Sequence, residues 1–148
     1  MFQHQRIVAL LVACAALASS ACGGGDSTPT APSTPTTAFS QTDIVVGTGA
    51  EAANGRRLSV HYTLWLHDAA RPESKGQQLQ TSVGGSPFSF VLGTGAVIRG
   101  WDQGVPGMKT GGTRRLVIPP SLAYGSSGQG SIPPNATLVF DIQLLDVQ

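Results

Sequence analysis

The stretch VIRGWDQGVPGMKTGG, Val97 to Gly112, places a tryptophan among glycines in a mostly apolar run. Its apolar residues recur at close to helical spacing: Val97, Trp101, Val105 and Met108. This spacing predicts a short helix, in which Gly100 and Gly104 lower the helix propensity but permit close packing against a sheet. On the residues alone, Trp101 is either core packing or the floor of an apolar pocket, and composition favours core packing.

Around this helix the sequence from Phe39 onward alternates apolar and polar residues, which is typical of strands. The segment LSVHYTLWL puts five alternate residues on one face: Leu58, Val60, Tyr62, Leu64 and Leu66. PFSFVL and TLVFDIQLLDV repeat the pattern, and DIVVG and RRLVI are shorter candidates. No other segment has a long helical period. We therefore predict an α+β fold, a mostly antiparallel sheet with one short helix on its concave face.

Length and charge set limits on function. The chain has 148 residues and a formal net charge of +1, enough for one domain with a core plus a tail. Near-neutral charge gives no electrostatic footprint for nucleic acid, so no nucleic-acid partner is expected, and it argues against a polybasic membrane patch. The doublets Arg56-Arg57 and Arg114-Arg115 are interpreted as solvated strand ends.

The amino-terminal residues have the composition of a secretory signal. A single arginine precedes the apolar segment IVALLVACAALA, Ile7 to Ala18. That length lies within the usual ~7–15 residues of a signal core and is short of the roughly 20 needed to span a membrane. Residues 1–21 are therefore predicted to be a lipoprotein-type signal peptide.

The end of this signal decides how the mature chain begins. Ser20-Ala21-Cys22-Gly23 resembles a bacterial lipobox, in which Cys22 carries the lipid, although Ser19 stands where leucine is preferred. Two alternatives are cleavage after Ala21 by an ordinary signal peptidase, and a lipobox at Leu11-Val12-Ala13-Cys14, which leaves a very short apolar core. We favour Cys22, because a low-complexity Gly/Ser/Thr/Pro segment follows at once. Residues 22–38 are then a lipidated cysteine and a flexible tether.

Common catalytic chemistries find no support in the sequence. His61 and His67 have no carboxylate cluster around them, and the serines lack an evident histidine partner. Gly47-Thr48-Gly49 is followed by no helix pattern, so it is interpreted as a turn rather than a dinucleotide site. No metal and no cofactor are expected.

Four segments together carry a family resemblance: VHYTLWL, VIRGWD, LAYG and IPPNATLVF. In this order, within a span from Asp43 to Val147, they resemble the FKBP-type peptidyl-prolyl cis/trans isomerases. The resemblance implies a twisted antiparallel sheet wrapped around one short helix. Residues 39–148 are accordingly predicted to be an isomerase domain.

The resemblance also implies a proline-binding pocket. Its catalytic residues would be Tyr62, Ile98, Trp101, Tyr124 and Phe140, and its other substrate-binding residues Phe88, Val97, Ile132, Leu79 and Gln80. Trp101 would be the floor under the proline ring. The Ile98 backbone N–H and the Tyr124 hydroxyl would donate hydrogen bonds to substrate carbonyls.

The chain departs from the family pattern beside this pocket. Leu79-Gln80 stands where the family usually has Phe-Asp, which removes an aromatic wall and a carboxylate. The turn from Val83 to Ser86 also lacks the arginine that often pairs with that carboxylate. The loop Gly125 to Ser131 is slightly shortened, and His67 to Gln78 is longer than in the smallest members. Isomerase activity is therefore expected, and the loss of the aromatic wall and the carboxylate would reduce it.

The sequence is compatible with three functions. The first is a prolyl isomerase that acts on X-Pro bonds of exported proteins in the periplasm, lipid-anchored to a bacterial membrane through Cys22 and inhibited by macrolides of the rapamycin type. The second is a non-catalytic peptide-binding or chaperone module on the same fold, suggested by Leu79-Gln80. The third is a lipid-anchored β-sandwich adhesion domain, which predicts no helix at Ile98 to Gly104. We rank them in that order.

Overall fold

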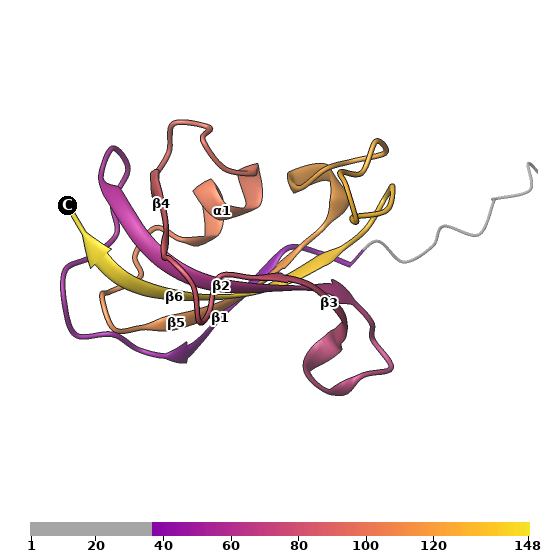
Figure 1. Ribbon diagram of the computed structural model, residues 1–148, viewed down its shortest axis with the longest axis horizontal. Helices are drawn as coiled ribbons and strands as arrows, with labels where there is room; N and C mark the ends of the chain where they lie inside the picture. The colour runs from indigo at the N-terminus through magenta and orange to yellow at the C-terminus, as the bar shows by residue number, and fades with distance from the viewer. Residues whose placement is uncertain (1–36) are drawn as a thin grey trace, which may run out of the picture. The chain divides into compact units, whose positions relative to one another are not determined.

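The computed structural model describes residues 37–148, which form one antiparallel sheet with a short helix (Figure 1). The strands are β1 (Ser40–Val45), β2 (Arg57–His67), β3 (Lys75–Thr81), β4 (Phe88–Val91), β5 (Thr113–Ile118) and β6 (Leu138–Val147). The helix is α1 (Arg99–Gly104), and 3-10 turns occur at η1 (Pro72–Ser74) and η2 (Pro120–Leu122). The expected signal peptide, the Cys22 lipidation site and all but the last two tether residues lie outside the described residues.

The strand order is β1-β5-β6-β2-β3, with β4 paired to β2, and every pairing is antiparallel. The long strand β2 therefore holds β3, β4 and β6 together. Helix α1 lies against the concave face of the twisted sheet (Figure 1). The predicted fold class is confirmed, and the β-sandwich alternative, which placed no helix at Ile98 to Gly104, is wrong.

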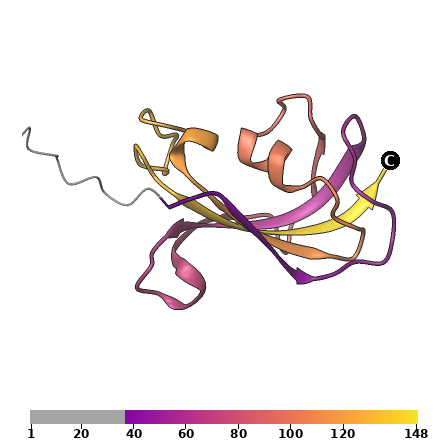
Figure 2. The same cartoon turned by 180° about the vertical axis from the view of Figure 1, so that it is seen from behind.

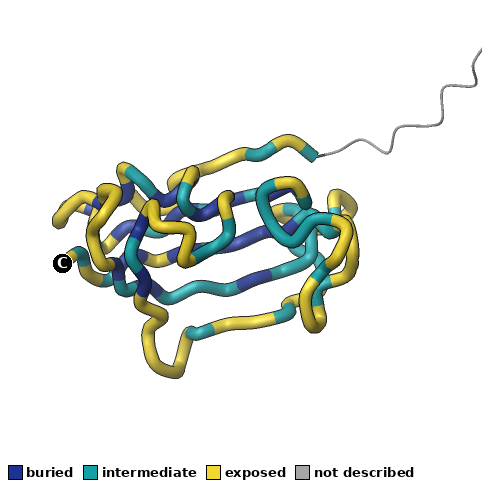
Figure 3. Tube along the Cα trace, turned by 90° about the horizontal axis from the view of Figure 1, so that it is seen from above, coloured by how far each residue is buried: buried dark blue, intermediate teal, exposed yellow. Residues whose placement is uncertain are grey.

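The apolar face of the sheet forms the core under α1. Leu58, Val60 and Leu64 of β2 are buried, as are the alternate residues of β6 from Leu138 to Leu144. The buried residues concentrate in the central strands, whereas much of the edges and loops is exposed (Figure 3). Val139, expected on the opposite face, is also fully buried.

Helix α1 is shorter than the apolar spacing suggested. Val97 and Ile98 precede it, with Ile98 at the N-cap in extended conformation, and Met108 lies beyond its end. Close packing against β5 explains the two glycines of α1, Gly100 and Gly104. A Cβ at Gly100 would lie 2.5 Å from Ile118 Cγ2, and one at Gly104 would lie 2.6 Å from Leu116 Cδ2. The helix can approach β5 this closely only without those side chains.

Arg114 is not the solvated strand end that the sequence suggested. It is only 7% exposed and donates from Nε to Asp43 Oδ1 at 2.5 Å and from Nη1 to the Gly104 carbonyl at 2.9 Å. The hydrogen bonds from Arg114 lower the pKa of Asp43, an effect that partial burial opposes. One arginine thus ties β1 to the end of α1.

The second arginine of the doublet belongs to a charged cluster on the other face, made of Glu73, Lys75, Arg115 and Asp141. Arg115 Nε lies 2.7 Å from Asp141 Oδ1, and Lys75 Nζ lies 2.7 Å from Asp141 Oδ2. Glu73 closes the ring through Lys75 at 2.9 Å and Arg115 at 3.2 Å. The loop that contains η1 is thereby held against the face opposite α1 (Figures 1 and 2).

Candidate active site

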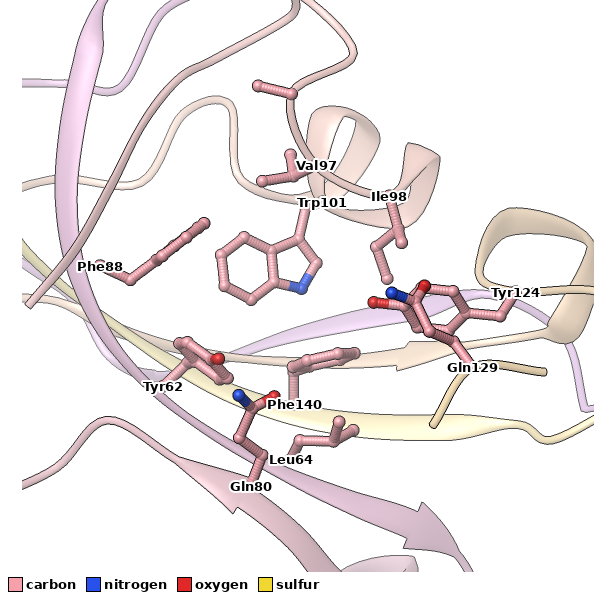
Figure 4. Close-up of a pocket in the computed structure, with 11 residues that line it drawn as sticks. Tyr62, Leu64, Gln80, Phe88, Val97, Ile98, Trp101, Tyr124, Gln129 and Phe140 are labelled. Atoms are coloured by element: carbon pink, nitrogen blue, oxygen red, sulfur yellow. The ribbon is translucent and has the colours of Figure 1, made fainter. Parts of the chain in front are cut away.

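A cavity of about 360 Å³ opens on the concave face, between α1 and the sheet (Figure 4). Its walls come from strands β2, β3, β4 and β6, from the segment that enters α1, and from the loop after η2. The lining residues are Tyr62, Leu64, Gln80, Phe88, Ala96, Val97, Ile98, Trp101, Tyr124, Gln129 and Phe140. Residues distant in sequence meet here because the twist of the sheet curls β2 and β6 under the helix.

Trp101 forms the inner wall of this cavity. It is only 4% exposed and projects from the first turn of α1 toward the sheet. Its ring lies 5.3 Å from that of Tyr62 and 5.3 Å from that of Phe140, both in edge-to-face geometry. Edge-to-face contacts between aromatic rings are favourable and restrict how the rings can be oriented. Trp101 is therefore both core and pocket wall, which resolves the choice that the sequence left open.

The indole N–H of Trp101 is buried and has no hydrogen-bond partner among the described residues. A buried donor without a partner carries a desolvation cost of about 1–3 kcal/mol. Few buried polar groups in native proteins lack a partner, so this N–H is a donor that the fold leaves unused.

Phe88 marks the mouth of the cavity. It is 40% exposed, although its ring lies 5.9 Å from that of Tyr62 and 6.1 Å from that of Trp101. Phe90, two residues on, is buried and stacks against Phe88 at 5.7 Å. The alternation along β4 thus gives one phenylalanine to the core and one to the entrance.

Two tyrosine hydroxyls line the cavity. Burial raises the pKa of Tyr62, with a smaller contribution from Tyr124, and burial raises the pKa of Tyr124. Both hydroxyls therefore stay protonated, and able to donate, well above neutral pH. Tyr124 lies just after η2, and its following residue Gly125 has φ +58°, a left-handed conformation that glycine adopts without strain.

Ile98 contributes its backbone. Its carbonyl accepts from the Trp101 N–H at 2.9 Å, which starts the helix. Within residues 37–148, no backbone hydrogen bond from the Ile98 N–H occurs. The first N–H groups of a helix and its N-cap have no intrahelical partner, so this donor is available to a bound carbonyl.

A second cavity of about 330 Å³ adjoins the first and shares Leu64, Gln80, Tyr124 and Gln129 with it. Its remaining lining residues are Leu79, Gly130, Ser131 and Ile132. Eight of the residues expected at the site therefore line the first cavity: Tyr62, Gln80, Phe88, Val97, Ile98, Trp101, Tyr124 and Phe140. Leu79 and Ile132 line only the second, and Cys22 lies outside the described residues.

Sequence reasoning did not select Leu64, Ala96 and Gln129. Leu64 was interpreted as core, and it is both buried and at the base of the cavity. Gln129 is presented by a tight turn, in which its N–H donates to Ile132 O at 2.9 Å and its carbonyl accepts from Ile132 N at 2.8 Å. Such a turn has no periodic pattern. The glycines at 128 and 130, with φ +64° and +55°, are its sequence signal.

The described lining of both cavities is uncharged, since it contains neither acid nor base other than the tyrosines. Residues 37–148 hold no group of three or more His, Cys, Asp or Glu side chains placed to bind a metal ion. Among the described helices, none is long and apolar enough to cross a membrane. The site can bind an apolar ring, donate to carbonyls and exclude water.

Comparison with known proteins connects this geometry to a family. The family model of the FKBP-type peptidyl-prolyl cis-trans isomerases matches residues 49–145. The chain is 44% identical over 106 residues to an FK506-binding protein of Neisseria meningitidis, covering 71% of this chain and 92% of that protein. It is 45% identical over 100 residues to the peptidyl-prolyl cis-trans isomerase FKBP15-3 of Arabidopsis thaliana, covering 68% and 66%.

Other relatives are longer. The chain is 48% identical over 106 residues to FK506-binding protein 4 of Neurospora crassa, but the match covers 72% of this chain and only 21% of that protein.

Solved structures agree with the sequence comparison. The crystal structure of AtFKBP13 superposes with a TM-score of 0.64 at 39% identity, over 74% of this chain and 93% of that one. FkpA from Escherichia coli gives a TM-score of 0.64 at 40% identity, over 74% and 48%. The chain belongs to the FKBP-type peptidyl-prolyl cis-trans isomerase family.

Proposed function

We propose that this enzyme rotates X-Pro bonds of exported proteins in the periplasm, from a lipid anchor at Cys22. The observation that carries the catalytic part is the uncharged cavity walled by Trp101, with the free Ile98 N–H and the Tyr124 hydroxyl at its edge. The anchor and compartment are supported by the apolar segment Ile7 to Ala18 and the Gly/Ser/Thr/Pro stretch after Cys22.

The cavity suits prolyl rotation because that reaction needs little acid-base chemistry. A peptide bond rotates against a barrier of roughly 18–20 kcal/mol, and X-Pro bonds take tens to hundreds of seconds unaided. The planar amide is dipolar and well hydrated, whereas the twisted amide loses resonance and much of its polarity. A dry aromatic wall therefore favours the twisted form relative to water.

Fixed donors complete this mechanism. With the proline ring on Trp101, the Tyr124 hydroxyl donates to the carbonyl of the residue before proline, and the Ile98 N–H donates to a carbonyl on the other side. Together with the Trp101 wall, these donors fix the two ends of the prolyl bond in a twisted relative orientation, so that binding favours the rotated amide over the planar forms. Both tyrosine pKa values are raised, so the hydroxyl remains a donor across the physiological range.

The direct test is NMR exchange between the cis and trans forms of a short Leu-Pro peptide, with and without a macrolide of the rapamycin type. We expect acceleration that the macrolide abolishes. Trp101→Ala combined with Tyr124→Phe should also abolish it, whereas Gln103→Ala, an exposed change on the same helix, should not. No acceleration by the folded protein would overturn the proposal.

Gln80 supports a second candidate, a non-catalytic peptide-binding module. It lines the first cavity where the family pattern has a carboxylate. The double substitution Leu79→Phe with Gln80→Asp separates the two functions. A large gain in isomerisation rate over an almost inactive natural protein would favour the binding module, whereas a change of less than about tenfold would favour the enzyme.

The anchor has its own test. In cells that export the protein, Cys22→Ala should move it from the membrane fraction to the periplasmic extract, and Cys14→Ala should leave it on the membrane. Unchanged membrane fractionation of Cys22→Ala would contradict lipidation at that position.

A further inference from the structure

We propose that the second cavity binds the side chain of the residue before proline and that Gln80 and Gln129 make it selective for glutamine at that position. The inference rests on the proposed function, in which Trp101 supports the proline ring. It concerns the neighbouring space between β3 and the turn at Gln129, which that function does not use.

The position of the cavity follows from Tyr124. This tyrosine lines both cavities, so a carbonyl held by its hydroxyl lies at their boundary. The carbonyl of the rotating bond belongs to the residue before proline. The side chain of that residue is attached to the Cα next to this carbonyl carbon. The adjoining cavity of about 330 Å³ is the space beside that Cα.

The second cavity has a mixed lining, in which three apolar side chains, Leu64, Leu79 and Ile132, lie beside polar ones. Leu64 is buried, whereas Leu79 on β3 and Ile132, which pairs with Gln129 across the turn, are half-buried. Methylene groups placed against these apolar side chains gain roughly 0.8 kcal/mol each when fully buried. The cavity therefore fits a side chain with an unbranched apolar stem.

The boundary of the cavity supplies two amide groups. Gln80 and Gln129 line both cavities, and neither side chain is hydrogen-bonded among the described residues. Figure 4 shows both side chains at the first cavity. Each amide offers one acceptor oxygen and two N–H donors. A substrate amide can therefore accept from one glutamine and donate to the other.

A charged side chain of similar length, such as glutamate or lysine, has no oppositely charged partner in the second cavity. The lining of the second cavity is Leu64, Leu79, Gln80, Tyr124, Gln129, Gly130, Ser131 and Ile132, without an acid or a base that is charged at neutral pH. Because Gln80 and Gln129 are exposed, a glutamate or lysine head beside them keeps part of its hydration but gains no opposite charge, whereas a glutamine amide can pair with both as donor and acceptor.

The test compares peptides that differ only before proline, with Gln, Met or Glu, three side chains of similar stem length. Isomerisation is measured as kcat/KM by NMR exchange, and binding as Kd from chemical-shift changes. For the wild type we expect Gln to exceed Glu by about threefold or more. Gln80→Leu and Gln129→Leu should each lower the Gln-to-Met ratio by about two- to fivefold, the effect of one partly exposed hydrogen bond.

The matched control is Gln77→Leu, which adds the same leucine to the exposed side of β3 but lines neither cavity. It should leave the Gln-to-Met ratio unchanged. A second peptide pair, with Gln or Met after proline, should show no response to Gln80→Leu.

The outcomes separate this inference from the proposed function. In one outcome, all peptides are isomerised, and the Gln-to-Met ratio is the same in the wild type, Gln80→Leu and Gln129→Leu. This result would overturn the subsite and leave the proposed enzymatic function standing. A response confined to the residue after proline also overturns the subsite. A third outcome is that no peptide is isomerised, but Kd still shows a preference for Gln that Gln80→Leu abolishes. This result would overturn the catalytic proposal and support the subsite.

Discussion

Tyr62 and Trp101 meet edge to face, with ring centroids 5.3 Å apart and planes at 80°. Tyr62 comes from the central strand β2 and Trp101 from α1, so this contact joins the sheet to the helix that covers it. Tyr62 also contacts Phe88 at 5.9 Å and Phe140 at 6.2 Å. Pairs of this kind contribute about 0.5–1.5 kcal/mol each beyond burial. Loss of the Tyr62 ring would therefore disturb fold and site together, and hydroxyl deletions are the cleaner probes.

Removal of the Tyr124 hydroxyl should separate binding from stability. Tyr124→Phe keeps the ring and deletes the donor, so kcat/KM for a Leu-Pro peptide should fall about two- to tenfold. The free energy of unfolding in urea should change by less than about 1 kcal/mol, because the hydroxyl makes no hydrogen bond in the described part of the chain. Tyr62→Phe is the matched comparison and should cost less activity. An equal loss in both variants would contradict the role given to Tyr124.

The rate should be nearly independent of pH across the physiological range. The tyrosines are the ionisable groups that line the first cavity, and burial raises the pKa of both above the usual 10.0. Deprotonation, and with it loss of the donor, is therefore expected only above about pH 10. NMR exchange from pH 6 to 9 should give a flat profile. A step within this range would show that an ionisable group outside the cavity lining controls the rate.

The strands and the helix could be predicted because their apolar residues repeat with a fixed period. Alternation places Leu58, Val60 and Leu64 in the core, as expected. Strand β3 was missed because KGQQLQT is polar and contains Gly76, and it is held by pairing with β2 rather than by its own pattern. The local alternation of apolar and polar residues does not indicate which strands, distant in sequence, will pair.

The candidate site could be predicted only in part, because some of its residues lie in segments without a repeating pattern. The aromatic residues belong to recognisable segments, whereas Gln129 sits on a turn fixed by hydrogen bonds to Ile132. The division into two cavities, which separates Ile132 and Leu79 from Trp101, depends on where the fold places the Gln129 turn relative to β3, the strand that carries Gln80. The buried Arg114 was missed because its partners Asp43 and Gly104 O come together only in the fold.

Gly100 should tolerate no side chain. An alanine Cβ there would meet Ile118 Cγ2 at 2.5 Å, and Ile118 is fully buried. Gly100→Ala should therefore force α1 away from β5 and lower the free energy of unfolding by about 1–3 kcal/mol. The activity should fall as well, since Trp101 moves with the helix. Urea denaturation followed by circular dichroism measures the first effect.

A matched control for Gly100 lies in the turn before β4. At Gly85 an added Cβ would have Ser82 O as its nearest neighbour, at 3.7 Å, an ordinary contact. Gly85→Ala should leave stability unchanged or slightly raised, because it restricts the unfolded chain. If both variants lost equal stability, the close approach of α1 to β5 would not explain the glycine.

Asp141 should make the domain sensitive to acid. Burial alone would raise the pKa of this carboxyl, but hydrogen bonds from Arg115 and Lys75 outweigh it and hold the pKa below its usual 3.8. The folded state therefore binds the proton more weakly than the unfolded state, so the stabilisation is present above about pH 5 and is lost as pH falls through the folded pKa. Asp141→Asn should lower the free energy of unfolding at pH 7 by about 1–3 kcal/mol and flatten its dependence on pH between 5 and 2. Asp146→Asn, on the same strand but exposed, is the control. A wild-type slope that persists in Asp141→Asn would show that other carboxylates, Asp43 first, govern acid unfolding.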